Sequence, residues 1–220
     1  MQDYQWITFD CYGTLIDWEH GITASFERTA KLTGSTFDPA KILYLYSKYE
    51  ASEEMSYKKY REVLNRVARR ICLELGYKVE DYTFLSESLA RWRPFADTNV
   101  ALERLARHYK LGILSNVDQD LLNETRKHFT VPFQLIVTAD QVASYKPDPR
   151  HFMEARKKIK DAKWIHAAQS FYHDVIPCSR LGIDVAWINR KQETPKDSNF
   201  HPIFNRPSIS AFADWMEGFD

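Results

Sequence analysis

Several apolar runs of the chain stop at polar side chains whose types can do chemistry. Asp10 ends the run QWITFD, and Ser170 ends the run WIHAAQS. Ser115 and Asn116 end the run YKLGILSN, and Lys146 stands in the loop SYKPDP after a further apolar run. A carboxylate must be ionised to attack, and a neighbouring lysine lowers its pKa. Asp10 and Lys146 are therefore candidates for catalysis or for binding a charged ligand.

The segments that must position these side chains alternate between strand and helix patterns. Strand-like runs cover residues 5–10, 109–116, 134–140, 164–170 and 184–190. Helix-like patterns cover residues 99–109, 119–129, 149–159 and 175–182. This alternation predicts an α/β fold with a doubly wound, Rossmann-like parallel sheet. Ligands bind at the carboxyl ends of the strands in such sheets, so we expect the polar residues to meet in one crevice.

Residues 16–94 interrupt the alternation with amphipathic helical segments, such as YKKYREVLNRVARRICLEL. We interpret this stretch as an all-helical cap domain inserted after the first strand, so that residues 1–15 and 95–220 form the core domain. A cap over the strand ends must present side chains to the substrate. The segment 191–208 contains three prolines and is predicted to be a surface loop.

Composition limits the partners of the protein. Thirty Lys and Arg balance thirty Asp and Glu, so no net field attracts nucleic acid or an anionic membrane. The cysteines Cys11, Cys72 and Cys178 lack CxxC spacing, which is typical of a reducing compartment. No signal segment and no apolar stretch of about 18 residues is present. We therefore expect a cytoplasmic protein whose partner is a small molecule.

Four short segments carry a resemblance to a known family. DCYGTL, LGILSN, SYKPDP and QSFYHD, in this order, resemble the four motifs of the haloacid dehalogenase superfamily, and the helical insert resembles its cap. The resemblance covers essentially the whole chain. It implies that Asp10 forms a covalent aspartyl intermediate and that Lys146 holds its charge. It also implies that Ser115 and Asn116 position the substrate and that Thr14 orients the carboxylate.

The residue two places after Asp10 bears on the reaction class. Phosphatases of the superfamily read Asp-x-Asp and use the second Asp as an acid, but this chain has Tyr12, whose ordinary pKa near 10 suits that role poorly. When Asp174 is aligned with the last acid of the fourth motif, Gln169 replaces the first Mg²⁺-binding acid. Both departures predict metal-independent chemistry without a cofactor, and Mg²⁺ would be needed only by a phosphatase.

The first motif is similar to that of the L-2-haloacid dehalogenases of type II, which read Asp-x-Tyr-Gly-Thr-Leu. That resemblance implies that Asp10 displaces a leaving group from the α-carbon of a small 2-substituted carboxylic acid with inversion. Water activated near Asp174 would then hydrolyse the ester and free a 2-hydroxy acid. Tyr12, Ser170 and Tyr172 join Asn116 as candidate substrate-binding residues.

Other positions depart from the dehalogenase pattern. The cap helix that should carry a halide-binding arginine has none, and Lys48 is the nearest cation and a further candidate for substrate binding. Phe152 and Phe171 replace a tyrosine and an asparagine of those enzymes. The pattern AQSFYHD is most similar to a branch that includes L-azetidine-2-carboxylate hydrolase. Its amine leaving group needs a proton donor, for which Tyr172 and His173 are candidates.

Three functions stay open at this point. The favoured one is a metal-independent hydrolase acting at carbon, on a haloacid or by opening a ring of the azetidine-2-carboxylate type. The second is a Mg²⁺-dependent phosphatase that tolerates Tyr12, and the third is a non-catalytic homologue that binds small acids. The tyrosine-rich cap helix is also a candidate surface for a homodimer.

Overall fold

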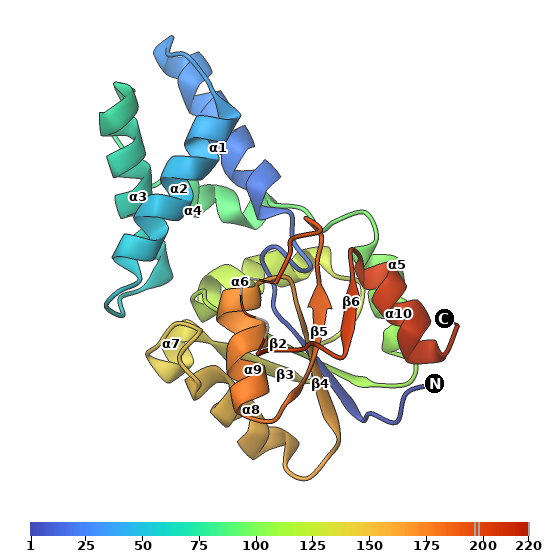
Figure 1. Cartoon of the computed structure of the whole chain (residues 1–220). Helices are drawn as coiled ribbons and strands as arrows, with labels where there is room; N and C mark the ends of the chain where they lie inside the picture. Colours follow the sequence, from blue (N-terminus) through green and yellow to red (C-terminus); the bar gives the residue numbers. More distant parts are fainter. Residues whose placement is uncertain (196, 198, 220) are drawn as a thin grey trace.

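The computed structural model describes residues 1–195, 197 and 199–219. Its strands form one parallel sheet in the order β3-β2-β1-β4-β5-β6 (Figure 1). The strands are β1 (Trp6–Phe9), β2 (Lys110–Ser115), β3 (Leu135–Thr138), β4 (Trp164–Ala168), β5 (Asp184–Ile188) and β6 (Phe204–Arg206). The predicted α/β, doubly wound architecture is thus confirmed.

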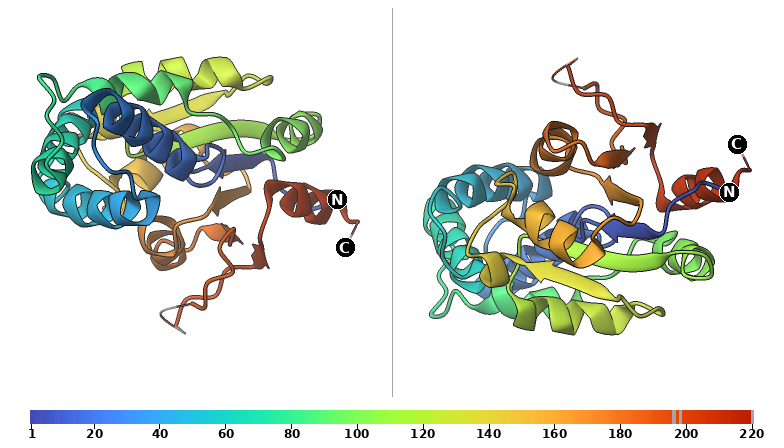
Figure 2. Two further views of the ribbon diagram at one scale, coloured as in Figure 1. Left: turned by 90° about the horizontal axis from the view of Figure 1, so that it is seen from above. Right: turned by 90° about the horizontal axis from the view of Figure 1, so that it is seen from below.

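Helices cover both faces of the sheet. α8 (Arg150–Ile159) and α9 (Ile176–Arg180) lie on one face, and α5 (Thr98–Leu105) and α10 (Ile209–Glu217) lie on the other (Figure 1). The N-terminal residues run beside α10, where the Gln2 amide donates to the Met216 carbonyl at 2.7 Å (Figure 2). The remaining core helices are α6 (Gln119–Thr125) and α7 (Ala139–Val142).

The order of the strands at the centre of the sheet explains the position of Asp10. β1 lies between β2 and β4, so the chain order reverses at its carboxyl end. Ile7 and Phe9 belong to the apolar core of the α5 and α10 face, and the buried Thr8 points to the opposite face. A reversal of this kind opens a crevice beyond the strand ends. Asp10, the first residue after β1, stands in that crevice.

A helical layer stands above the carboxyl ends of the strands (Figure 1). It comprises α1 (Trp18–Thr33), α2 (Pro39–Glu53), α3 (Tyr60–Leu75), α4 (Phe84–Ser88) and the 3-10 turn Leu89–Arg91. Asp17 caps α1, and Asp38 caps α2, which has Pro39 in its first turn. We call this layer the cap, and the exact domain boundaries given above stay a prediction.

Two chain segments connect the cap to the core, and they lie side by side. Ile16 forms an antiparallel bridge with Pro94. The Asp17 amide donates to the Arg93 carbonyl at 2.9 Å, and the Phe95 amide donates to the Leu15 carbonyl at 3.1 Å. These hydrogen bonds fix the cap at the point where the chain leaves and re-enters the core.

The prediction of a surface loop over residues 191–208 is wrong in part. β6 lies within it and pairs with β5, with Phe204 opposite Ala186. The Phe204 ring packs at 5.4 Å from the ring of Phe212, so burial of one aromatic side chain stabilises the strand. Pro202 and Pro207 flank β6 and do not interrupt it. Residues 196 and 198 of the segment lie outside the described residues.

Within the described residues, the helices are too short or too polar for one to cross a membrane. The predicted helix 175–182 begins earlier than expected, because a π-helical turn (Phe171–Val175) precedes α9. π-helical turns often occur at functional sites, and this one carries Asp174.

Gly21 shows how closely α1 approaches the end of the cap. A Cβ atom at Gly21 would lie 2.3 Å from Cγ of Trp92, whose indole nitrogen donates to Ser88 Oγ at 2.9 Å. We expect Gly21→Ala to lower the free energy of unfolding by about 1–3 kcal/mol because the added methyl group overpacks this contact. Urea denaturation measures the change.

A double-mutant cycle isolates the contact. In a Trp92→Ala background the ring is absent, and we expect Gly21→Ala to be neutral or stabilising, since alanine favours the helix by about 1 kcal/mol. Equal losses of stability in the two backgrounds would contradict the overpacking explanation.

Candidate active site

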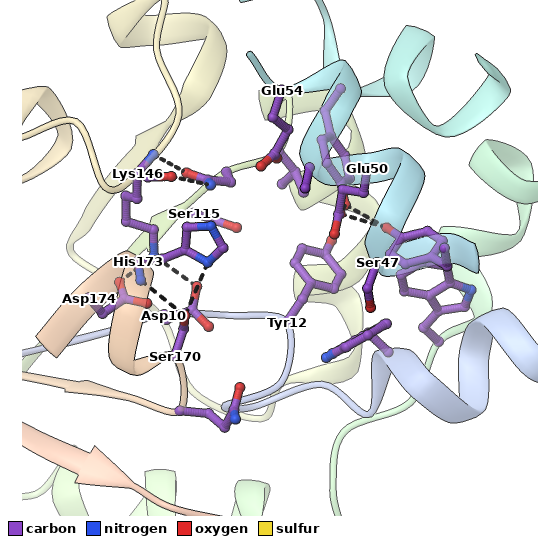
Figure 3. Close-up of a pocket in the computed structure, with 18 residues that line it drawn as sticks. Asp10, Tyr12, Ser47, Glu50, Glu54, Ser115, Lys146, Ser170, His173 and Asp174 are labelled. Atoms are coloured by element: carbon purple, nitrogen blue, oxygen red, sulfur yellow. Dashed lines mark hydrogen bonds and ion pairs between the residues drawn. The ribbon is translucent and has the colours of Figure 1, made fainter. Parts of the chain in front are cut away.

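A cavity of about 310 Å³ lies between the cap and the carboxyl ends of the strands (Figure 3). The core side of the cavity is lined by Asp10, Tyr12, Ser115, Asn116, Val117, Lys146, Gln169, Ser170, His173 and Asp174. The cap side is lined by Trp18, Tyr46, Ser47, Glu50, Ala51, Glu54, Tyr60 and Trp92. The crevice expected from the sequence is thus a cavity, partly covered by the cap, in which the strand-end residues meet.

Lys146 is the central cation of the cavity. Its ammonium donates to Asp10 Oδ1 at 2.9 Å, to Asp174 Oδ1 at 2.6 Å and to the Leu114 carbonyl at 3.0 Å, so all three N–H groups are used. The side chain is 1% exposed. Burial opposes its charge, but Asp10 and Asp174 hold the pKa of Lys146 above its ordinary value. The lysine is therefore charged and fully occupied by its neighbours.

Asp10 is held through both carboxylate oxygens. Lys146 binds Oδ1, and the Thr14 hydroxyl donates to Oδ2 at 2.9 Å. The Thr14 oxygen in turn accepts the Gln169 amide at 2.9 Å, which fixes the direction of its own proton. Gly13 has φ +96°, a conformation that favours glycine, and it turns the chain so that Thr14 faces back to Asp10. The carboxylate is thus oriented before any ligand binds.

Asp174 is the second carboxylate at Lys146. Its Oδ1 accepts from Lys146 and from Nε2 of His166 at 3.1 Å, and within the described residues its buried Oδ2 has no hydrogen-bond partner. Burial raises the pKa of Asp174, but Lys146 and His166 hold it below its ordinary value. Asp174 is thus an ionised residue of the cavity lining, and one of its oxygens lacks a donor among the described residues.

A buried chain of hydrogen bonds orients Asp174 from behind. The Trp164 indole donates to Thr8 Oγ1 at 2.6 Å, which leaves the Thr8 proton for Nδ1 of His166 at 2.8 Å. Burial lowers the pKa of His166, so the ring is neutral and its remaining proton lies on Nε2, toward Asp174. Sequence analysis missed His166, because a single polar residue within an apolar strand carries no local signal.

Ser115, the last residue of β2, and Asn116, which follows it, differ in whether their polar atoms already have partners. Ser115 is buried, lines the cavity, and its hydroxyl has no partner within the described residues. Asn116 uses its amide on the Lys146 backbone, accepting from the amide nitrogen at 2.7 Å and donating to the carbonyl at 3.2 Å. Ser115 can therefore bind a ligand directly, while Asn116 positions the lysine loop.

The other predicted substrate-binding residues divide into two groups. Tyr12 and Ser170 line the cavity. Burial raises the pKa of Tyr12, whose hydroxyl contacts Thr125 Oγ1 at 2.7 Å, so it is a neutral phenol. Lys48 and Tyr172 are exposed and do not line the cavity. Lys48 lies on another side of α2 from the residues that face the cavity, which follow the spacing 47, 50, 51 and 54.

Sequence analysis missed two carboxyl groups on the cap. Glu50 and Glu54 line the cavity, and the hydroxyls of Tyr46 and Tyr60 both donate to Glu50 Oε1. Burial raises the pKa values of both glutamates. The one sequence signal is their helical spacing, but Glu53 beside them forms an ion pair with Arg70 outside the cavity. Charge alone could not separate the inward glutamates from the outward one.

The residues do not fit a magnesium site of the phosphatase type. Lys146 already binds both Asp10 and Asp174, and Gln169 offers an amide where an acid would be needed. Among the described residues, no group of three or more His, Cys, Asp or Glu side chains is arranged to hold a metal ion.

The chain is similar to known proteins over most of its length. Residues 7–188 match the family model described as haloacid dehalogenase-like hydrolase. The chain is 27% identical to an (S)-2-haloacid dehalogenase of Pseudomonas putida and 25% identical to one of Pseudomonas fluorescens, over 98% of each chain.

Solved structures share the fold over nearly the whole chain. An L-2-haloacid dehalogenase structure matches with a TM-score of 0.86 at 18% identity, covering 99% of this chain and 100% of the other. A second, from Xanthobacter autotrophicus with chloropropionic acid covalently bound, matches with a TM-score of 0.82 at 17% identity and the same coverage.

His151 behind Ser115 generates a prediction on stability. Its Nε2 donates to the Ser115 carbonyl at 3.1 Å, and burial lowers the pKa of His151 to about 3. The unfolded chain, with a histidine pKa of about 6.5, binds more protons between these values, so stability falls as pH falls below about 6.5. We expect His151 to account for a loss of about 2 kcal/mol between pH 7.5 and pH 5.

Urea denaturation of wild type and His151→Gln at both pH values measures this contribution. Glutamine can still donate to the Ser115 carbonyl but does not titrate, so the pH-dependent loss should be smaller in the variant by that amount. Carboxyl groups titrate alike in the two proteins and cancel. An identical pH dependence would show that His151 is not held neutral.

Proposed function

The chain belongs to the haloacid dehalogenase-like hydrolase family, and on that basis we propose that it attacks a carbon centre of a small 2-substituted carboxylic acid through an ester at Asp10. The reaction needs no metal, resembles that of 2-haloacid dehalogenases and releases a 2-hydroxy acid. The similarity to (S)-2-haloacid dehalogenases over 98% of the chain supports this proposal.

The observation that carries the proposal is the way Asp10 is held at the cavity. Lys146 and Thr14 bind one carboxylate oxygen each, which orients the nucleophile. Tyr12, a neutral phenol bonded to Thr125, takes the position of the acid that a phosphatase needs. A nucleophilic carboxylate without an acid partner suits displacement at carbon.

In the first step an Asp10 oxygen bonds to the α-carbon, and the bond to the leaving group breaks with its electron pair. The ester carries no charge, so Lys146 loses one of its two counter-charges. Asp174 still binds the lysine at 2.6 Å and keeps the buried ammonium paired. The presence of two carboxylates at one lysine therefore lets the charge on Asp10 disappear without leaving the ammonium unpaired.

In the second step water attacks the carbonyl carbon of the ester, and the bond from this carbon to the substrate oxygen breaks. The departing alkoxide takes up the proton that the water loses, which releases the 2-hydroxy acid and restores the Asp10 carboxylate. The carbonyl oxygen keeps a donor whichever oxygen formed the ester, because Lys146 serves one and Thr14 the other. Asp174 Oδ2 is a free acceptor for the water, although its low pKa makes it a weak base. His173 lines the cavity, and burial lowers its pKa, so a neutral imidazole is available to take the proton.

Hydrolysis at the aspartyl carbonyl predicts an isotope result. In H₂¹⁸O, with enzyme in excess over (S)-2-chloropropionate or L-azetidine-2-carboxylate, we expect ¹⁸O to enter the Asp10 peptide during a single turnover. Mass spectrometry of the digested protein detects it. The Asp10→Asn variant should take up no label and lose at least about 10³-fold in kcat. Turnover that labels only the product would rule out the aspartyl ester.

Thr14 provides a second prediction, because its hydroxyl both donates to Asp10 and accepts from Gln169. Thr14→Val keeps the shape but removes both hydrogen bonds, and we expect kcat to fall by about 10- to 100-fold. Thr14→Ser keeps the hydroxyl and should stay within a few-fold of wild type. Steady-state kinetics with either substrate measures both variants, and equal kcat values for Val and Ser would exclude a role for the hydroxyl.

A cytoplasmic location and a homodimer stay predictions. The cap carries exposed aromatic side chains, Tyr44 and Tyr57, that could contribute to such a dimer.

A further inference from the structure

The cap side of the cavity carries two carboxyl groups that the proposed mechanism does not use. Glu50 and Glu54 extend from α2 across the cavity from Asp10 (Figure 3). They are four positions apart and so lie on the same side of the helix. Both are half-buried. A wall that faces a nucleophile across a small cavity must contact whatever substrate the nucleophile attacks.

Glu50 is fixed in place, while Glu54 is not. The Tyr46 and Tyr60 hydroxyls both bind Oε1 of Glu50 and connect α2 to α3. Within the described residues no partner binds Oε2 of Glu50, and the carboxyl group of Glu54 forms neither a hydrogen bond nor an ion pair. Glu50 therefore has a structural function, because it connects two helices. Within the described residues, Glu54 makes no contact that would give it one.

Among the residues that the structure describes, the cavity lining offers no unpaired cation to balance these groups. Lys146 uses its three N–H groups in hydrogen bonds to Asp10, Asp174 and the Leu114 carbonyl. Lys58, the other ammonium near Glu54, is paired with Glu53. Burial and the neighbouring Glu50 raise the pKa of Glu54, so two close carboxyl groups oppose each other's ionisation. A positively charged group would relieve this opposition.

The core side of the cavity carries a hydrogen-bond donor for the anionic end of a ligand. Ser115 is buried and lines the core side of the cavity together with Lys146, and its hydroxyl has no partner in the described residues. A hydroxyl can donate to a carboxylate. A ligand with an anionic end at Ser115 and a cationic end at the cap would therefore supply an acceptor for the Ser115 hydroxyl and a counter-charge for the two glutamates.

We propose that Glu50 and Glu54 form a subsite for a positively charged nitrogen, so that the small acid attacked by Asp10 also carries an ammonium group. This inference rests on the proposed function and specifies its substrate class. A plain 2-haloacid would bring only negative charge to a cavity whose cap wall is already acidic. The ammonium group of a zwitterion places a cation between the two glutamates.

Binding to a variant that cannot turn over tests the subsite separately from the chemistry. In Asp10→Asn, isothermal titration compares L-azetidine-2-carboxylate with cyclobutanecarboxylate, and L-2-aminobutyrate with (S)-2-methylbutyrate. Each pair differs only in a cationic nitrogen and an isosteric carbon. We expect the nitrogen compound of at least one pair to bind about tenfold more tightly.

Glu54→Gln in the same background should reduce that preference to about threefold or less, while the affinity for the carbon isostere stays the same. Glu27→Gln is the control, because Glu27 is a cap glutamate on α1 that pairs with Lys31 and does not line the cavity. It should keep the full preference. Circular dichroism and thermal denaturation check that both variants fold.

The proposal is overturned if no nitrogen compound binds more tightly than its isostere, or if the preference is the same in Glu54→Gln. Failure of the subsite and failure of the proposed function give different results. Isotope in the Asp10 peptide together with no preference for nitrogen would retain the ester and reject the subsite. A preference lost in Glu54→Gln, without isotope from any substrate, would retain the subsite and reject the ester.

Discussion

The buried ammonium of Lys146 is the constraint on which the site depends. A lysine that is 1% exposed must be paired, and here Asp10 and Asp174 lie within 2.9 Å of its nitrogen. These residues come from three distant parts of the sequence: the end of β1, the loop before α8 and the turn after β4. Only a sheet in which β1 lies between β2 and β4 brings the three together, and Asn116 clamps the lysine backbone so that the side chain reaches them.

The two walls of the cavity differ in how their charge is balanced. On the core side, the Asp10–Lys146–Asp174 arrangement is internally paired and stays so after Asp10 becomes an ester. On the cap side, Glu50 and Glu54 have no counter-charge of their own within the described residues. Among the described residues, each charged group of the core wall thus has an oppositely charged partner before a ligand binds, whereas Glu50 and Glu54 have none. This difference supports a division in which the core carries out the reaction and the cap selects the substrate.

Sequence reasoning located residues that the fold brings together where a local pattern marks them. Asp10, Thr14 and Lys146 follow apolar runs or tight turns, and those features can be seen in a single segment. It failed where the position of a side chain depends on packing. The rotation of α2 on its neighbours turns Glu50 inward and Lys48 outward, although both stand in the same charged run. β6 was missed for the same reason, since the burial of Phe204 against Phe212 stabilises it more than its own residues predict.

One core residue sets the spacing between the two walls. Asp118, which follows β2 and is buried, accepts the backbone amides of Tyr60 at 3.1 Å and Arg61 at 3.0 Å. The first turn of α3 lacks a side-chain cap of its own, so a carboxylate of the core satisfies amides of the cap. The Tyr60 hydroxyl binds Glu50, so the position of Tyr60 also fixes that of Glu50. The acidic wall is therefore fixed to the strand that carries Ser115, and the distance from Glu50 to the core wall is a property of the fold.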